Sequence, residues 1–265
     1  MWSWDIKGEM RLSVLNGNLI VKFTDYLTGR PFYSFLGNNN PNETAEKLLK
    51  FSTSEGKKAQ LKLIPEESTH GIDLEKFELK EDRDHFDYIY NLEELKSMQG
   101  GKFARKRNQV SLFLKNHPTA TAKIFDLKDK NLQGHIINLF LEWLKIKKDK
   151  EEVFESHEEV AVSRLLLATD ICRLVGIGVF IEEKLIGFFI DELTDSNYVV
   201  AHASKTDKVF AGVNSFLVRE NALLLLSFSK ELFNFEQDLG MANLRDAKTR
   251  FRPVKFLKKY KLTLR

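Results

Sequence analysis

The sequence passes twice through the same order of patterns, and this internal repeat constrains the fold more than any other feature. Between residues 87 and 125, a strand pattern is followed by a polar loop, the Gly100-Gly101 pair, a helical pattern and a second strand pattern. Between residues 198 and 234 the same order recurs around Gly212, and the two glycines are equally far from the strand that follows. Strands that alternate with helices predict a mixed α/β fold.

Each repeat follows a hairpin pattern, in residues 18–36 and 176–193. The simplest architecture is two copies of one α/β module, the first in residues 1–145 and the second in residues 146–265. The segment 145–159, dense in charges of both signs, is expected to be a linker or an exposed helix end. The alternative is that the repeated order is a coincidence of the kind any α/β protein can show.

A glycine turn at the start of the first predicted helix carries an unusual concentration of positive charge. No acidic residue occurs between Lys102 and Lys123. Basic side chains oppose the dipole of a helix N-terminus unless an anion is bound there, and glycines let backbone amides approach that anion. We therefore predict a phosphate site; the alternative is a solvated lysine-rich face, since the Walker spacing is absent. The residues concerned are Gly100, Gly101, Lys102, Arg105, Lys106, Arg107 and Asn108.

The second repeat offers a less basic version of the same loop. Lys205, Lys208 and Gly212 are its candidate phosphate-binding residues, and His202 precedes them at the end of the strand pattern. The literal Arg173-x-x-Gly176-x-Gly178 spacing looks like an acetyl-coenzyme A signature. It precedes a hairpin and not a helix, so it is interpreted as a turn, which makes acetyl-coenzyme A the less favoured donor.

The overall composition excludes several classes of protein. The 41 basic and 38 acidic residues leave a net charge of only +3, so any affinity for nucleic acid or membranes must come from local clusters. No apolar run approaches the length of a membrane helix. The single Cys172 cannot form an internal disulfide, which is consistent with a reducing cytoplasm.

Several motifs together resemble a known family. In the first half these are residues 87–90, 92–95, 100–103, 106–108 and 113. In the second half they are residues 233–240, 244–245, 247–248, 252–254 and 257–260. The sequence resembles the soluble relatives of the C-terminal catalytic domain of phosphatidylglycerol lysyltransferases, a bacterial family grouped as a domain of unknown function. The resemblance implies two tandem GCN5-related acetyltransferase-like folds, similar also to the Fem peptidyltransferases.

The resemblance also implies an activity. Better-known members of this fold pass an aminoacyl group from a charged tRNA to a lipid headgroup hydroxyl or a peptide amine. The membrane-spanning part of the lysyltransferases has no counterpart in this sequence, so lipid modification does not carry over directly. The leading hypothesis is an aminoacyl or acyl transferase; the alternatives are an acetyl-coenzyme A-dependent N-acyltransferase and a non-catalytic module that binds RNA or anionic surfaces.

Three polar residues follow the last strand of the second repeat. If the alternation of a strand continued, Asn234, Glu236 and Asp238 would point to one side. Such a group could position an amine or hydroxyl nucleophile or recognise a cationic aminoacyl group, and one carboxylate could act as general base if burial raised its pKa. The alternative is that Asp238 begins a turn and caps a helix, with Glu236 paired to a lysine.

The last 21 residues are strongly basic and contain interleaved aromatic residues. Nine are lysine or arginine, Arg250 and Arg252 among them, and Asp246 is the single acid. This block could contact an RNA backbone or anionic lipid headgroups, although charged tails are common. The six histidines show no metal-ligand spacing, and no Gly-x-Ser-x-Gly motif occurs, so we expect neither a metal site nor a serine hydrolase.

Overall fold

A computed structural model describes residues 10–25, 29–56, 59–148 and 158–265. These residues form two mixed sheets and separate into two compact units. The first unit comprises residues 1–87, 237–245 and 256–265, and the second comprises residues 88–236 and 246–255. These units are defined by packing, whereas the halves 1–145 and 146–265 come from a repeat in the sequence, and that duplication stays a prediction.

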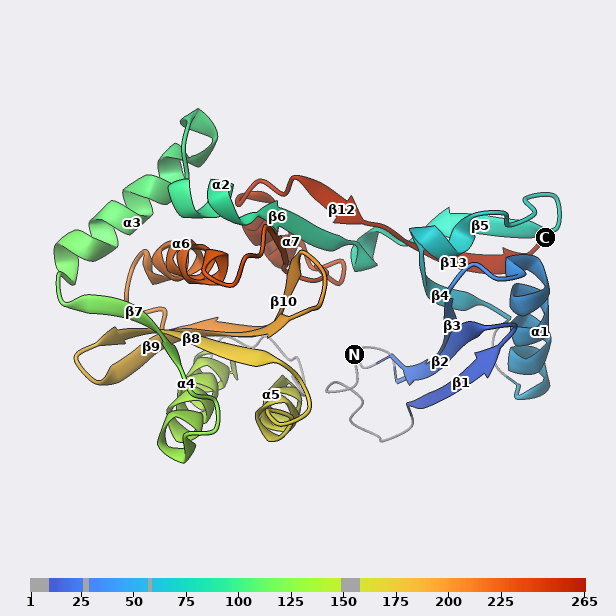
Figure 1. The fold of residues 1–265 in the computed structure, drawn as a ribbon, viewed down its shortest axis with the longest axis horizontal. Coiled ribbons are helices and arrows are strands. Elements are labelled where there is room, and N and C mark those ends of the chain that lie inside the picture. Colours follow the sequence, from blue (N-terminus) through green and yellow to red (C-terminus); the bar gives the residue numbers. More distant parts are fainter. Residues whose placement is uncertain (1–9, 26–28, 57–58, 149–157) are drawn as a thin grey trace. The chain divides into compact units, whose positions relative to one another are not determined.

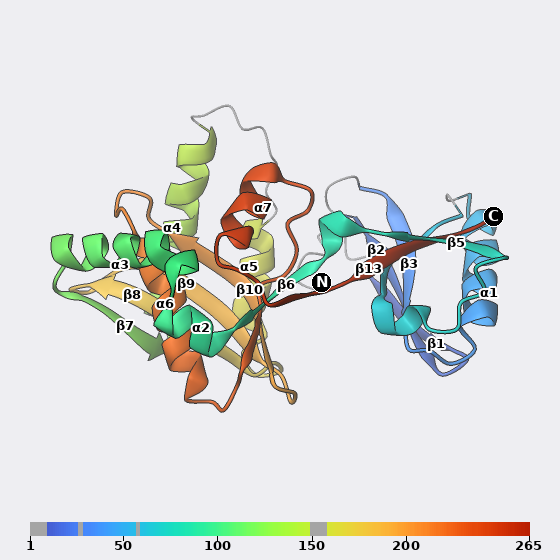
Figure 2. The ribbon, with the colours of Figure 1, turned by 90° about the horizontal axis from the view of Figure 1, so that it is seen from above.

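The first unit is a six-stranded sheet covered by one long helix. Its strands lie in the order β1-β2-β3-β4-β13-β5, and helix α1 packs against one face (Figures 1 and 2). Ala45, Leu48 and Leu49 recur at helical spacing in α1 and join the apolar side chains of the sheet in one core. The elements are β1 (Arg11–Leu15), β2 (Asn18–Thr24), β3 (Pro31–Leu36), α1 (Pro41–Ser54), β4 (Leu61–Pro65), β5 (Phe77–Glu81) and β13 (Lys259–Leu264).

The predicted hairpin at 18–36 is confirmed by β2 and β3. The basic C-terminal block is not a free tail. Its strand β13 lies between β4 and β5. Lys258, Lys259 and Lys261 pair with Glu81, Asp87 and Asp82 of the same unit.

The second unit is a seven-stranded sheet with helices on both faces. Its strands lie in the order β12-β6-β11-β10-β9-β8-β7, with β11 parallel to β10 and the other described pairs antiparallel. The elements are β6 (Asp87–Asn91), α2 (Leu92–Ser97), α3 (Ala104–Asn116), β7 (Ala120–Phe125), α4 (Lys130–Lys148), α5 (Glu158–Leu167), β8 (Leu174–Ile181), β9 (Lys184–Leu193), β10 (Tyr198–Thr206), α6 (Val213–Leu226), β11 (Leu232–Asn234), α7 (Ala242–Thr249) and β12 (Lys255–Leu257).

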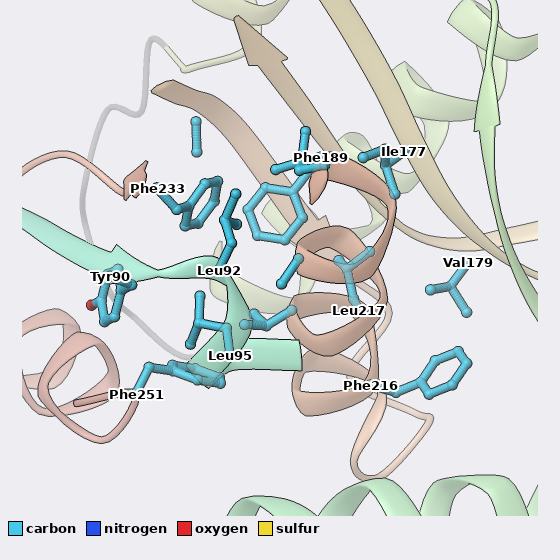
Figure 3. Close-up of a cluster of buried hydrophobic side chains, with 14 of the residues drawn as sticks. Tyr90, Leu92, Leu95, Ile177, Val179, Phe189, Phe216, Leu217, Phe233 and Phe251 are labelled. Atoms are coloured by element: carbon cyan, nitrogen blue, oxygen red, sulfur yellow. The ribbon is translucent and has the colours of Figure 1, made fainter. Parts of the chain in front are cut away.

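Two separate cores lie on the two faces of this sheet. Helices α2, α3 and α6 cover one face, and α4 and α5 cover the other (Figure 1). The alternation along β9 follows this division, because Phe189 belongs to the first core while Phe188 and Ile190 belong to the second. Figure 3 shows part of the first core, where Phe189 and Phe233 lie beside α6 and Phe251 lies near Leu95.

The Arg173-x-x-Gly176-x-Gly178 segment is not the turn predicted from the sequence, because both glycines lie inside β8. A Cβ atom at Gly176 would lie 2.7 Å from the Phe125 ring, and one at Gly178 would lie 2.7 Å from the Phe180 ring. The glycines therefore make room for aromatic side chains of the core. Of the charged segment 145–159, residues up to Lys148 continue α4, and residues 149–157 lie outside the described part of the chain.

Candidate active site

His202 occupies an irregular position in the middle of the second sheet. Ala201 pairs with Asp191 of β9 and Ala203 pairs with the next residue, Ile190, so His202 has no partner opposite it. This is a β-bulge, which changes the direction in which side chains point. Ala201 belongs to the core under α6, whereas Ala203 belongs to the core under α4 and α5. Because of the bulge, the direction of the His202 side chain does not follow from the regular alternation of inward and outward residues along β10.

Two carboxylates flank the His202 imidazole. Its Nε2 lies 2.6 Å from Oε2 of Glu192, and its Nδ1 lies 3.4 Å from Oε1 of Glu236. Burial lowers the pKa of His202, but the hydrogen bonds and charges of Glu236 and Glu192 outweigh burial and raise its pKa above the usual value. The imidazole thus lies between two carboxylates, an arrangement suited to acid-base chemistry.

Glu236 is held in place by its backbone. Its φ angle is +53°, an uncommon conformation for a residue other than glycine. Its N–H donates to Oδ1 of Asn234 at 2.8 Å, and its carbonyl oxygen accepts from the N–H of Tyr88 at 3.1 Å. The Lys248 ammonium donates to the adjacent Phe235 carbonyl. These bonds fix the Glu236 side chain beside His202 while leaving it 36% exposed.

Opposing effects set the pKa of the Glu236 carboxyl. Burial raises this pKa. The hydrogen bond and charge of His202 and the charge of Lys248 lower it by more than burial raises it, so the pKa lies below its usual value. The structure thus brings together three of the predicted residues, Asn234, Glu236 and His202. The predicted alternation does not explain this, because β11 ends at Asn234.

The sequence analysis missed Asp191, a fully buried carboxyl group close to this cluster. Burial raises its pKa well above the usual value, against the opposing effects of Asn221 and His202. No side-chain oxygen or nitrogen of Asp191 or Asn221 has a hydrogen-bond partner of acceptable geometry among the described residues. An acidic residue directly after the apolar run 185–190 was a visible signal, because such a position is normally buried.

Asp238 belongs to the first unit and is fully buried. It accepts hydrogen bonds from Arg83 at 3.2 Å, from Nε and Nη2 of Arg245 at 2.9 Å each, and from the Gly240 N–H at 2.9 Å. This agrees with the turn that the sequence offered as the alternative interpretation. Its lone pairs are occupied by donors, which suits a structural carboxylate better than a general base.

The glycine turn before α3 serves local structure in part. Gly100 has a φ angle of +79°, which favours glycine. Arg107 donates to the carbonyl groups of Met98 and Gly100, and Lys102 pairs with Glu94 at 2.6 Å. Arg105 and Asn108 are exposed, while Lys106 is buried.

Two residues from the C-terminal block lie at this turn. Arg252 donates from Nε to the Lys102 carbonyl at 3.4 Å, and the charge of Arg250 acts on Lys106. Arg250, directly after α7, also pairs with Asp246 of that helix at 2.8 Å. Two basic segments that are 150 residues apart in the sequence are therefore one surface in the fold.

The second predicted phosphate loop is packed differently. Lys205 pairs with Glu158 at 2.7 Å and lies 4.1 Å from the Trp143 ring centroid. Lys208 and Trp143 line a shallow pocket with Leu139, Glu142, Thr206 and Asp207. Gly212 lies against α3, where a Cβ would approach the Gln109 carbonyl oxygen to 2.3 Å. Gly212 therefore allows the two helices to approach closely.

The described residues contain no group of three or more histidine, cysteine, aspartate or glutamate side chains arranged to hold a metal ion. Among the helices that the structure describes, none is both long enough and apolar enough to span a membrane.

The family model described as phosphatidylglycerol lysyltransferase, C-terminal, matches residues 7–263. The chain belongs to this family, as the sequence motifs indicated. A search among curated proteins gives no match.

Solved structures share the fold. A conserved protein of unknown function from Bacteroides thetaiotaomicron is 24% identical with a TM-score of 0.85, over 100% of this chain and 88% of that one. L-PGS from Bacillus licheniformis is 14% identical with a TM-score of 0.67, over 97% of this chain and 84% of that one. FemX is 9% identical with a TM-score of 0.58, over 98% of this chain and 90% of that one. The predicted α/β fold class, similar also to the Fem proteins, is confirmed.

Proposed function

We propose that this protein is a transferase that moves an aminoacyl group from an aminoacyl-tRNA to an amine or hydroxyl acceptor. Family membership and the fold shared with L-PGS and FemX support a transferase. The observation that carries the proposal is the partly open cluster of His202, Glu192 and Glu236 at the bulge of β10. Acyl transfer needs a group that takes a proton from the nucleophile and one that returns a proton to the leaving oxygen.

The partly exposed carboxylate of Glu236 is the proposed proton acceptor. Its pKa is lowered and not raised as the sequence hypothesis required, so the carboxylate is favoured in the ionised form that can take a proton. As the acceptor nitrogen or oxygen attacks the ester carbonyl, it forms the new bond to carbon and loses its proton to Glu236. The ester C–O bond then breaks, and the charged imidazole of His202 protonates the ribose oxygen that leaves. The raised pKa of His202 favours the charged imidazole that this step needs, and Glu236 can return the proton to His202 through their contact.

The remaining predicted residues have supporting places in the proposal. Asn234 holds the backbone of Glu236, so it positions the proposed proton acceptor. The buried, fully hydrogen-bonded Asp238 is assigned to structure. The placement of Gly176 and Gly178 inside β8 removes the main sequence argument for acetyl-coenzyme A as the donor.

The test is transfer from labelled aminoacyl-tRNA to a phosphatidylglycerol vesicle, a peptide amine or a small amine, with acetyl-coenzyme A as a competing donor. Glu236→Gln should lower the rate about a hundredfold or more, because it removes the proton acceptor. Glu183→Gln, in the exposed turn between β8 and β9, is the matched control and should transfer at the wild-type rate. Absence of transfer to every acceptor, or an unchanged rate in the Glu236→Gln variant, would refute the proposal.

A further inference from the structure

Lys106 is a buried cation without an anionic partner. The residue is only 9% exposed, and its ammonium makes no hydrogen bond or ion pair with any of the described residues. Its Nζ lies 3.7 Å from the ring centroid of Phe251, a residue of the core that Figure 3 shows. The ammonium nitrogen itself is not fully enclosed, so a ligand can reach it, and partial burial of an unpaired ammonium is unfavourable for stability.

The neighbours of Lys106 are also basic. Arg105 precedes it in the first turn of α3, and Arg250 lies close enough for its charge to act on Lys106. Arg252 reaches the Lys102 carbonyl, and Arg107 belongs to the same turn. We call this surface the Lys106 patch, defined as Lys102, Arg105, Lys106, Arg107, Arg250 and Arg252.

Acidic groups only partly compensate the patch. Glu94 pairs with Lys102, and Asp246 pairs with Arg250. No described acid pairs with Arg105 or Lys106. The 3-10 turn Gly101–Phe103 and α3, which follows it directly, add the positive end of a helix dipole to the same place, while the Ala104 N–H donates to the Gly101 carbonyl. The positive charge is therefore concentrated where Lys106 has no partner.

We propose that the Lys106 patch is a phosphate-binding site, with the Lys106 ammonium at its centre and the Arg105 and Arg250 guanidinium groups beside it. A phosphate supplies the anion that Lys106 lacks and accepts paired hydrogen bonds from guanidinium groups. This inference rests on the proposed function, since the phosphates would belong to the donor. They could come from the backbone of an RNA or from the pyrophosphate of a coenzyme.

Binding can be measured without turnover. The probes are a labelled single-stranded RNA oligonucleotide, titrated by fluorescence anisotropy over a salt series, and inorganic pyrophosphate, titrated by calorimetry. Lys106→Met should weaken binding of the matching probe about tenfold or more. For the RNA it should also reduce the slope of log K against log salt by about one. Lys106→Arg, which keeps the charge, should restore part of the affinity.

The matched control is Lys123→Met. Lys123 is likewise without an ion pair among the described residues and lies over an aromatic ring, with its Nζ 4.7 Å from the Phe180 centroid, but it belongs to β7. Its replacement removes the same charge outside the patch and should leave both titrations unchanged. A response to RNA alone identifies a polynucleotide as the source of the phosphates, and a response to pyrophosphate identifies a smaller donor.

Equal binding of both probes by wild type and a folded Lys106→Met variant would overturn the site. The site and the transferase proposal can fail separately. Patch-dependent binding without aminoacyl transfer would keep the site and refute the transferase, whereas transfer with an unchanged KM in Lys106→Met would refute the site alone.

Discussion

Replacing Lys106 by methionine should make the second unit more stable at neutral pH. Methionine keeps the length and apolar stem of lysine but removes the buried charge. Burial, followed by the charges of Arg250 and Arg105, lowers the pKa of Lys106 from 10.5 to about 8, with Asp246 acting in the opposite direction. This difference corresponds to about 3 kcal/mol of unfavourable free energy for the charged form. The lost contact with the Phe251 ring offsets about 0.5–2 kcal/mol, which leaves a gain of about 1–3 kcal/mol.

The sign of the pH dependence follows from the direction of the shift. Between about pH 8 and pH 10.5 the unfolded chain binds more protons than the folded chain, so wild-type stability rises with pH relative to the variant. The advantage of Lys106→Met should therefore be complete below about pH 8 and should fade towards pH 10.5. Urea unfolding of wild type, Lys106→Met and the Lys123→Met control at pH 7 and pH 10 measures this difference.

The reasoning is refuted if the difference between wild type and Lys106→Met is the same at both pH values. A difference that changes in the Lys123→Met control as well would assign the effect to overall charge. Saturating pyrophosphate or RNA should reduce the difference in free energy of unfolding between Lys106→Met and wild type at pH 7, because a bound anion stabilises the charged lysine in the wild type.

Three other changes test separate parts of the structure. Gly212→Ala should lower the free energy of unfolding by about 2–4 kcal/mol, because it places a Cβ against the Gln109 carbonyl at a φ of +89°. Gly100→Ala, in open space but at φ +79° and ψ 173°, should cost about 1–3 kcal/mol from backbone strain alone in the same urea titration. The melting temperature of Asp191→Asn should rise relative to that of wild type as the pH increases from 4 to 7. The pKa of Asp191 is higher in the folded than in the unfolded chain, so wild-type stability is lost as the pH rises above the pKa of the unfolded chain. A difference in melting temperature that stays constant with pH would contradict a neutral Asp191. Asp238→Asn should cost about 2–3 kcal/mol by weakening the bonds from Arg83 and Arg245, measured by urea unfolding, and should leave the transfer rate of the folded fraction unchanged if its role is structural.

Regular patterns made much of the fold predictable. The hairpin around Glu182, the helix after Gly212 and the strand at Leu232 were all visible as periodic apolar runs with glycine or polar breaks between them. Strands β5 and β13 were not, because charged residues stand among their few apolar ones: Glu78, Lys80 and Glu81 in β5, and Lys259 and Lys261 in β13. Pairing between segments far apart in the sequence leaves no local signal.

The candidate site was predictable residue by residue but not as an arrangement. His202 and Glu236 were both singled out, yet their contact depends on a bulge in β10 and on the left-handed backbone of Glu236. Neither feature has a sequence pattern, since the residues involved are not glycines. Lys106 likewise looked like one cation among several, and only the packing of Phe251 against it distinguishes it from its neighbours.

The position of β13 constrains the order in which the chain can fold during synthesis. Residues 259–264 form the strand between β4 and β5, so the two strands cannot acquire their shared neighbour until the chain has been synthesised from Glu81, the end of β5, to Lys259. While the second unit is being translated, the edges of β4 and β5 that pair with β13 therefore stay unpaired. Such a delay favours slow maturation and a dependence on chaperones that shield exposed strand edges.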